Sequence, residues 1–208
     1  IGFLRACLPG EVVAATIGKV EVKRVSRVHV LHTTPTARIE IASHSATGQA
    51  RMKPLVELLR SVGLECAVVP SEAEVLWGKL VRLNAVALTT AASGLPIGEV
   101  RSDSDWRARL SACVKEAAEV AQDQGFEIPS DVVMNQIDAL PYNLGTSMQR
   151  DVELGVESEV DAISGGIVRL AGRKGLECPA ISDLILMVRE RTKSREIEKR
   201  HVVSSGAA

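Results

Sequence analysis

The chain has 208 residues, of which 46% are hydrophobic and 25% are charged, and its formal net charge is −1. These values are typical of a globular protein with a hydrophobic core. A net charge near zero without a basic stripe argues against nucleic acid as the main partner. The chain has two Trp, one Tyr and two Phe, too few to suggest a surface on which bases stack, and its core must be aliphatic.

Four cysteines are scattered along the chain without a C-x-x-C motif. A disulfide framework or a zinc site would need closer spacing, so we expect no metal site and buried free thiols in a reducing cytoplasm. No apolar run reaches about 18 residues, and the first residues lack the pattern of a signal peptide. We therefore expect a cytoplasmic protein without a membrane partner. The cysteines are Cys7, Cys66, Cys113 and Cys178.

Residues 1–70 mix strand patterns with one helical pattern. Valines between residues 20 and 30 alternate roughly with polar residues, as in half-buried strands. The segment Thr33-Thr-Pro-Thr36 is a turn signal, and residues 37–41 alternate again. This pattern predicts a hairpin-like pair of strands on either side of the turn.

A helix and a further strand are predicted next. Apolar residues recur at helical spacing from Met52 to Val62, and Gly63 follows where a helix C-terminal cap is expected. Residues 66–69 have the composition of a short buried strand. The order of predicted strands and helix in residues 1–70 is therefore the one expected for half of an α/β sheet.

From Ser71 the pattern becomes helical. Ser71 and Glu74 form a predicted capping box, and the run that follows to about Ala92 is apolar nearly all round, which predicts a buried helix. Further helices are expected near 103–125, 130–140, 146–154, 158–174 and 180–200. Their predicted N-caps and stops are Ser130, Thr146, Ser158, Gly155 and Gly175.

The first 70 residues lack the motifs of a complete nucleotide-binding fold. There is no G-x-G-x-x-G after a strand and no P-loop, and a few strands with uncovered edges make a poor independent unit. The chain also begins at Ile1 and not at Met. We therefore expect missing partner strands and an upstream part that has been removed.

Lys79 is the first candidate for chemistry. In a helix among aliphatic neighbours, a lysine loses hydration, which lowers its pKa and favours proton donation near neutral pH. Alternatively, the side chain extends to the helix edge and keeps its amine in water, and the pattern alone favours this second interpretation.

Ser147 and Glu159 lie near the starts of two predicted helices. A hydroxyl and a carboxylate brought together could hold a small polar substrate, but each also has a structural alternative. Thr146 or Ser147 would cap its helix, and Glu159, next to Ser158 in a predicted capping box, would complement the helix dipole. Capping is favoured by the pattern alone.

Other polar and glycine positions have structural explanations. Asn84 could bind a ligand from within its helix, or it could be a satisfied core group. The glycines Gly165, Gly166 and Gly172 are expected to let helices approach closely and not to form a phosphate loop, since they lie inside a helical pattern. The charged run from Arg189 to Arg200 reads as a solvated helix end.

Two segments resemble the ketopantoate reductase (2-dehydropantoate 2-reductase) family. The first is Leu76-Trp-Gly-Lys-Leu80 followed by Asn84-Ala, and the second is Ser147-Met-Gln-Arg-Asp-Val-Glu-Leu-Gly155 followed by Glu159-Val-Asp161. Gly175-Leu-Glu-Cys-Pro179 and the strands before Ser71 fit as well. The resemblance therefore extends over essentially the whole chain.

The resemblance implies a fold and a division of the chain. The fold would be the α/β remnant of a Rossmann domain followed by an all-α domain like the C-terminal domain of 6-phosphogluconate dehydrogenases. Residues 1–70 would be the C-terminal half of an NADP-binding Rossmann domain, and residues 71–208 the helical substrate-binding and catalytic domain. The glycine-rich N-terminal half would be missing, so we expect the chain alone to be inactive.

The resemblance also implies roles for residues. Lys79 would be the general acid that protonates the ketone oxygen, Ser147, Asn84 and Glu159 would bind the substrate, and Glu159 would also contact the cofactor. The reaction would be the NADPH-dependent reduction of ketopantoate to pantoate in pantothenate and coenzyme A synthesis. The partners would be a small 2-keto acid and, in a homodimer, a second copy of the chain.

The chain departs from the family pattern at two positions. Family members commonly have asparagines four and eight residues after the lysine, where this chain has Leu83 and Ala87. Asn84 is one position off, about 100° around the helix. The substrate could therefore be another 2-keto acid, and a third hypothesis is a helical binding or dimerisation module without catalysis.

Overall fold

The structure, a computed structural model, describes residues 2–8, 13–18, 20, 22–32 and 37–205. The chain divides into two compact units, unit 1 (residues 1–79) and unit 2 (residues 80–208). The division falls inside the long helix α3 (Glu72–Ser93), which is continuous through it. The domain boundary that the resemblance implies at residue 70 stays a prediction.

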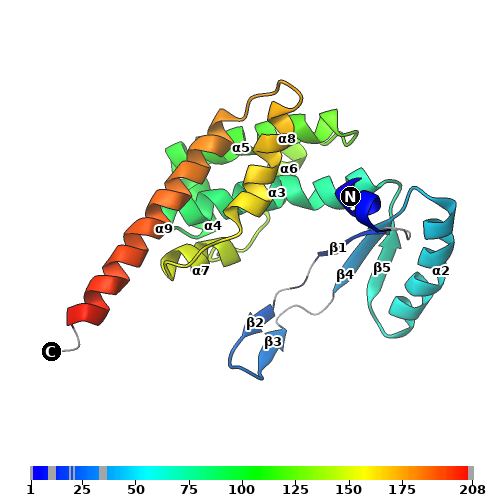
Figure 1. Cartoon of the computed structure of the whole chain (residues 1–208), viewed down its shortest axis with the longest axis horizontal. Helices are drawn as coiled ribbons and strands as arrows, with labels where there is room; N and C mark the ends of the chain where they lie inside the picture. The colour runs from blue at the N-terminus through cyan, green and yellow to red at the C-terminus, as the bar shows by residue number, and fades with distance from the viewer. Residues whose placement is uncertain (1, 9–12, 19, 21, 33–36, 206–208) are drawn as a thin grey trace. The chain divides into compact units, whose positions relative to one another are not determined.

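Unit 1 is built on a three-stranded sheet (Figure 1). Its order is β1 (Ala14–Gly18), β4 (Arg38–Ala42) and β5 (Glu65–Val68). β4 pairs antiparallel with β1, Ala14 opposite Ala42, and parallel with β5, Ile39 opposite Cys66. Parallel neighbours need a crossover connection, and α2 (Ala46–Ser61) supplies it.

The hairpin predicted across Thr33–Thr36 does not exist, and the turn segment itself lies outside the described residues. β2 (Val22–Arg24) pairs with β3 (Val30–His32), while β4 pairs with β1. Valines of the β2–β3 region are exposed and not half-buried, because the described part of the chain offers these two strands no further partner. The exposed fractions are 48% for Val22, 53% for Val30 and 96% for Val28, which lies outside both strands.

Helix α2 covers the sheet through one apolar face. Met52 and Val56 pack with Ile41 of β4 and Cys66 of β5 in a buried cluster. Ser45, which accepts the N–H of Gly48 at 2.9 Å, caps its N-terminus six residues before the predicted start. Its end is the predicted one, because the N–H of Gly63 donates to the carbonyl of Arg60. A short helix, α1 (Gly2–Cys7), precedes the sheet and was not predicted.

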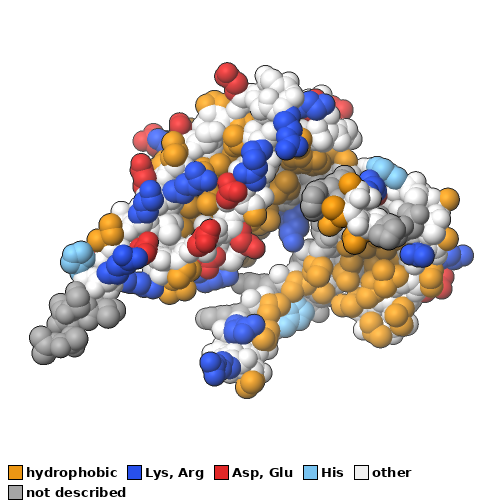
Figure 2. Space-filling view, viewed as in Figure 1, with side chains coloured by type: hydrophobic (Ala, Val, Ile, Leu, Met, Phe, Trp, Pro, Cys, Tyr) orange, Lys and Arg blue, Asp and Glu red, His pale blue; other side chains and the backbone are white. Residues whose placement is uncertain are grey.

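Strand β5 is less buried than expected. Only Cys66 is buried in it, and Val68 is 54% exposed, since β5 is an edge strand of the described sheet. Hydrophobic side chains gather over β4 and β5 in the view of Figure 2. Arg60 donates twice to the outward carbonyl of Cys66, at 2.9 and 2.7 Å, and so satisfies part of this edge.

Helix α3 begins as predicted and is buried over its second half. The N–H of Glu74 donates to the hydroxyl of Ser71 at 3.0 Å. From Asn84 to Ala92 every residue is buried, whereas Leu76 and Lys79 in the first half are exposed. The prediction of a helix buried on all sides is therefore right for the second half and wrong for the first.

The described residues of unit 2 form helices joined by turns and loops, without a strand (Figure 1). Aliphatic residues form its core, as the composition predicts, and α5 packs against α6, α8 and α9. After α3 its elements are α4 (Ile97–Ser102), α5 (Ser104–Asp123), α6 (Ser130–Asp138), α7 (Ser147–Glu153), the π-helical turn η1 (Asp161–Gly165), α8 (Gly166–Gly172) and α9 (Pro179–Ser205).

The predicted caps of unit 2 are partly right. Thr146 caps α7 by accepting the N–H of Gln149 at 3.1 Å. Ser130 and Ser158 do not cap, because Pro129 and Val160 occupy the N-cap positions without a side-chain hydrogen bond. The helices α7 and α8 do stop before Gly155 and Gly175, and both glycines have a positive φ.

The expectation that glycines let helices approach closely is wrong for this part of unit 2. A Cβ at Gly166 or Gly172 would meet no atom of another segment within 4 Å. A Cβ at Gly165 would meet the side chains of Asp161 and Arg169, which form an ion pair at 3.0 Å on the same helical segment. Gly165 therefore makes room for an ion pair.

Candidate functional site

Lys79 presents an exposed amine. Its Nζ donates to the carbonyl oxygen of Ile17 on β1 at 2.9 Å, within unit 1. Of the two interpretations, the structure agrees with the one that the pattern favoured, because the side chain leaves the buried face of α3 and keeps its amine exposed. The Ile17 carbonyl is its partner among the described residues, so the amine can turn to a ligand without breaking an ion pair.

Ser147 is the first residue of α7 and is exposed. Thr146 takes the capping role, so the hydroxyl of Ser147 is not needed for the helix end. Among the described residues the Ser147 hydroxyl makes no hydrogen bond. This residue therefore offers a donor and an acceptor to a ligand at the start of a helix.

Glu159 is exposed and also has no ion pair or side-chain hydrogen bond in the described part of the chain. Its backbone carbonyl accepts the N–H of Ile163, which places Glu159 at the start of the helical segment that includes η1. A carboxylate at a helix N-terminus complements the partial positive charge there. The predicted capping box with Ser158 is absent, so the carboxylate is available to other donors.

Asn84 lies inside the core of unit 2. Its side chain is 0% exposed, and its amide nitrogen donates to the sulfur of Cys113 at 3.2 Å, while its amide oxygen has no partner. The nitrogen thus behaves as a satisfied core group. The role of Asn84 in substrate binding stays a prediction that requires access to a buried side chain.

The thiols around Asn84 are held neutral. Burial raises the pKa of Cys113 far above its usual range, and the charge of Glu116 adds to this effect. Burial and the same carboxylate raise the pKa of Cys178 to about 11. Cys66 is buried as well, but Cys7 is exposed, so the expectation of four buried thiols is wrong at one position.

Within the described part of unit 2, no hydrogen bond or ion pair joins Asn84, Ser147 and Glu159 to one another. Lys79 belongs to unit 1, and the other three belong to unit 2. Ser147 and Glu159 share exposure and an unpaired polar group at the start of a helical segment, whereas Asn84 is enclosed. The predicted roles of all four residues stay predictions.

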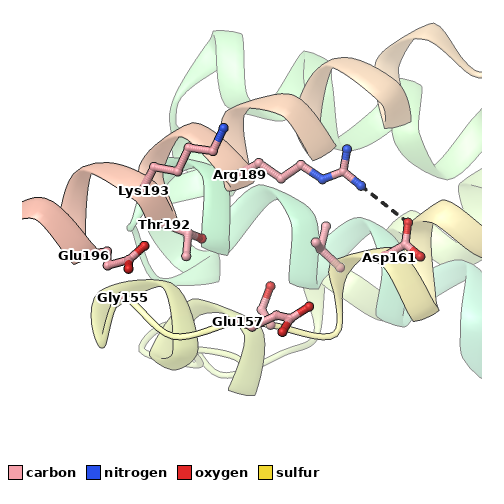
Figure 3. A pocket seen from close by; sticks show the side chains of 9 residues that line it. Gly155, Glu157, Asp161, Arg189, Thr192, Lys193 and Glu196 are labelled. Carbon is pink, nitrogen blue, oxygen red and sulfur yellow. Dashed lines mark hydrogen bonds and ion pairs between the residues drawn. The ribbon is translucent and has the colours of Figure 1, made fainter.

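A groove of about 440 Å³ on unit 2 was not predicted from the sequence (Figure 3). The segment 155–160 forms one side and α9 the other, and Arg189 reaches across to Asp161 at 3.4 Å. Lys193 and Glu157 line it without ion pairs among the described residues. The sequence predicts that the charged run of α9 is a solvated helix end. Figure 2 shows Lys and Arg side chains alternating with acidic side chains over this helix. Glu159 adjoins this groove in sequence but does not line it.

The described residues contain no cluster of three or more His, Cys, Asp or Glu side chains arranged to hold a metal ion. A search of the same residues finds no helix with the length and apolarity needed to cross a membrane.

Comparisons with known proteins give the family of the chain. Residues 72–192 match the family model described as ketopantoate reductase PanE/ApbA C terminal. A 2-dehydropantoate 2-reductase of Archaeoglobus fulgidus is 28% identical over 144 residues, which are 69% of this chain and 48% of that protein. The chain thus spans about half the length of the curated relatives it matches.

Solved structures share the fold. A D-mandelate dehydrogenase in complex with NADH and anilino(oxo)acetate has a TM-score of 0.83 at 18% identity, with 94% of this chain and 65% of that chain covered. A dimeric ketopantoate reductase of Staphylococcus aureus has a TM-score of 0.76 at 20% identity, with 91% and 65% covered. The predicted α/β portion followed by a helical domain is confirmed as the fold class. Because the family model spans more than half of the sequence, this chain belongs to the ketopantoate reductase PanE/ApbA family.

Proposed function

We propose that the protein to which this chain belongs reduces ketopantoate to pantoate with NADPH, in the cytoplasm, as a step of pantothenate and coenzyme A synthesis. The observation that carries the proposal is the family match over residues 72–192, which includes Lys79, Ser147 and Glu159. The structure supports it at the level of side chains, because these three residues are exposed and make no ion pair with any other described residue. Their polar groups are therefore available for a substrate.

The chemistry assigns each residue a role. Hydride addition to the keto carbon pushes the carbonyl electrons onto oxygen, so a cation beside that oxygen stabilises the transition state. Lys79 is the cation, and it then gives one Nζ proton to the oxygen to complete the alcohol. Its amine gives up the bond to the Ile17 carbonyl, and because it is exposed it regains a proton directly from water. Ser147 donates its hydroxyl hydrogen to the substrate.

The cofactor fits this chain only in part. The bound nicotinamide supplies the hydride. The exposed carboxylate of Glu159 fits an acceptor for ribose hydroxyl or carboxamide N–H groups. The 208 residues contain no G-x-G-x-x-G loop, so we propose that residues outside the printed sequence bind the pyrophosphate. We also propose that the protein uses NADPH in preference to NADH.

A second substrate is favoured by two positions on α3. Leu83 is half-buried and Ala87 is 2% exposed, and both offer only apolar atoms one and two turns after Lys79. Of the two, half-buried Leu83 is the one a substrate can meet, and an apolar side chain there suits a 2-keto acid with an apolar side chain better than one with a hydroxyl. The similarity of fold to a D-mandelate dehydrogenase is consistent with an aromatic 2-keto acid as this alternative.

We further propose that the protein forms a homodimer, as the related reductase of Staphylococcus aureus is named to do. A helical module that only dimerises, without catalysis, is the remaining alternative. It provides no reason for the side chains of Ser147 and Glu159, both in the family-matched segment, to be exposed without a partner among the described residues.

The test is Lys79→Ala in the complete protein, with NADPH oxidation as the readout. Loss of both the cation and the proton donor should lower kcat by roughly several hundred-fold. Lys115→Ala, which removes an exposed lysine from α5, is the matched control and should change kcat by less than about twofold. A loss below about tenfold for Lys79→Ala would falsify the assignment.

A further inference from the structure

Two threonine hydroxyls join α3 to the start of α7. Thr90 of α3 is 0% exposed, and its Oγ1 lies 3.0 Å from the Oγ1 of Thr146, the N-cap residue of α7. The two residues are 56 positions apart in the sequence, and both belong to unit 2. This bond therefore links the helix that begins with Ser147 to the buried half of α3.

The neighbouring bonds settle which hydroxyl donates. Thr90 Oγ1 lies 2.8 Å from the carbonyl oxygen of Val86, which can only accept. Thr146 Oγ1 already accepts the N–H of Gln149 at 3.1 Å. A hydroxyl has one proton, so every proton finds an acceptor only when Thr90 donates to Val86 and Thr146 donates to Thr90. The result is a directed chain of three hydrogen bonds, each of which polarises the next.

Helix α7 depends on such external ties. It has seven residues, too few for a helix to be stable by itself. At its other end Glu153 accepts from Arg191 at 2.6 Å and pairs with Arg195 at 3.0 Å, both on α9. The hydroxyl chain therefore determines where the first turn of α7 lies against α3.

The stripe of α3 that contains Thr90 includes the positions discussed for substrate selection. Leu83, Ala87 and Thr90 are spaced by four and three residues, so they share one face of the helix. Thr90 is the polar end of this stripe. Through Thr146 it holds the residue next to Ser147, whose own hydroxyl is exposed and unpaired.

We propose that Thr90 and Thr146 are positioning residues, whose hydroxyl chain sets the location of the Ser147 hydroxyl for the substrate. The inference rests on the proposed function for the role of Ser147. Neither threonine needs to touch the substrate, because Thr146 acts through the backbone it shares with Ser147, and Thr90 acts through Thr146.

The test compares Thr90→Val with Thr89→Val in the complete protein. Thr89 is also 0% exposed and donates to its own helix, to Ala85 at 2.8 Å, but its hydroxyl has no partner on another helix among the described residues. Thr90→Val should raise KM for the 2-keto acid about tenfold, with kcat within about threefold, since a binding contact is misplaced in ground and transition state alike. Thr89→Val and the hydroxyl-retaining Thr90→Ser should leave KM within about twofold of the parent.

A second variant covers the case in which Thr90→Val does not fold. Thr146→Ala removes the hydroxyl that caps α7 and donates to Thr90, whereas Thr146→Ser keeps a hydroxyl that can do both. Thr146→Ala should raise KM like Thr90→Val, and Thr146→Ser should leave KM within about twofold of the parent. Equal KM values for Thr90→Val and Thr89→Val, or for Thr146→Ala and Thr146→Ser, overturn the inference.

Amide hydrogen exchange separates failure of this inference from failure of the proposed function. The N–H of Gln149, bound to Thr146, should exchange faster in Thr90→Val than in Thr89→Val. If the complete protein turns over no 2-keto acid, the proposed function fails, and exchange alone then decides whether the hydroxyl chain holds α7. Equal exchange rates in the two variants overturn it.

Discussion

Gly155 lies where two constraints meet. Its φ is +56°, in the left-handed region that residues with a Cβ rarely adopt. In addition, a Cβ there would lie 2.8 Å from the backbone nitrogen of Glu196 on α9. Gly175 has a similar φ of +71°, but a Cβ would meet nothing within 4 Å. Both glycines therefore need a positive φ, but only at Gly155 does the backbone of another segment come close enough to exclude a Cβ.

Gly155→Ala should therefore destabilise the protein more than Gly175→Ala. We expect about 1 kcal/mol from the conformation alone at Gly175, and roughly 2–4 kcal/mol at Gly155, where α9 backbone must also move. Urea unfolding of the two variants measures both values. Equal destabilisation would show that the contact between segment 154–156 and α9 is not tight.

At the same scale, polar partners were the part of the site that the sequence could not predict. Lys79 was expected in either of two environments, and only the structure shows the amine exposed on the Ile17 carbonyl. Thr146 could be predicted as a cap because that bond is local. Its second bond, to Thr90, joins residues far apart in the chain, and no local pattern indicates it.

Helix α7 is the element on which the account of Ser147 depends. Its last turn is held by ion pairs from Glu153 to Arg191 and Arg195, and the amine of Lys199 donates to the carbonyl of Leu154. Cations at a helix C-terminus complement its partial negative charge. The hydrogen bond from Arg191 is the main cause that lowers the pKa of Glu153 below its usual value.

This pKa shift predicts an acid-dependent effect of Glu153→Gln. A carboxylate whose folded-state pKa is lowered adds stability above its unfolded pKa, near 4.5, and this stability is lost as pH falls through the folded value. Because the side chain is 38% exposed, we expect only about 0.5–1 kcal/mol at pH 7. Urea midpoints of parent and variant should differ at pH 7 and converge as the pH falls below about 4.5, whereas a constant difference would contradict the ionic account.

Elements with strong local signals were predicted well, and pairings were not. The apolar periodicity from Met52 to Val62 and the cap at Ser71 indicated α2 and α3, since both signals are local. The strand segment 37–41 was recognised, but it pairs with β1 and not with the strand before the turn. Strand pairing depends on contacts between distant residues, which alternation within one strand does not encode.

At the scale of the whole molecule, the reaction we propose is the reduction of a 2-keto acid. Family membership follows from the match over residues 72–192, and the fold from solved structures that cover more than nine tenths of the chain. The alternative proposed substrate, an apolar 2-keto acid, rests on Leu83 and Ala87 of α3, whose side chains contain only apolar atoms. Composition argues against nucleic acid as the main partner, but it cannot distinguish one 2-keto acid from another.

The most direct measurement is kcat/KM of the complete protein with NADPH for ketopantoate and for phenylglyoxylate, an aromatic 2-keto acid. The account predicts that ketopantoate is reduced to pantoate with a kcat/KM at least about tenfold above that of phenylglyoxylate. The reverse preference would show that the substrate is a 2-keto acid with an apolar side chain and not ketopantoate. Absence of NADPH and NADH oxidation with either acid would contradict the catalytic account altogether.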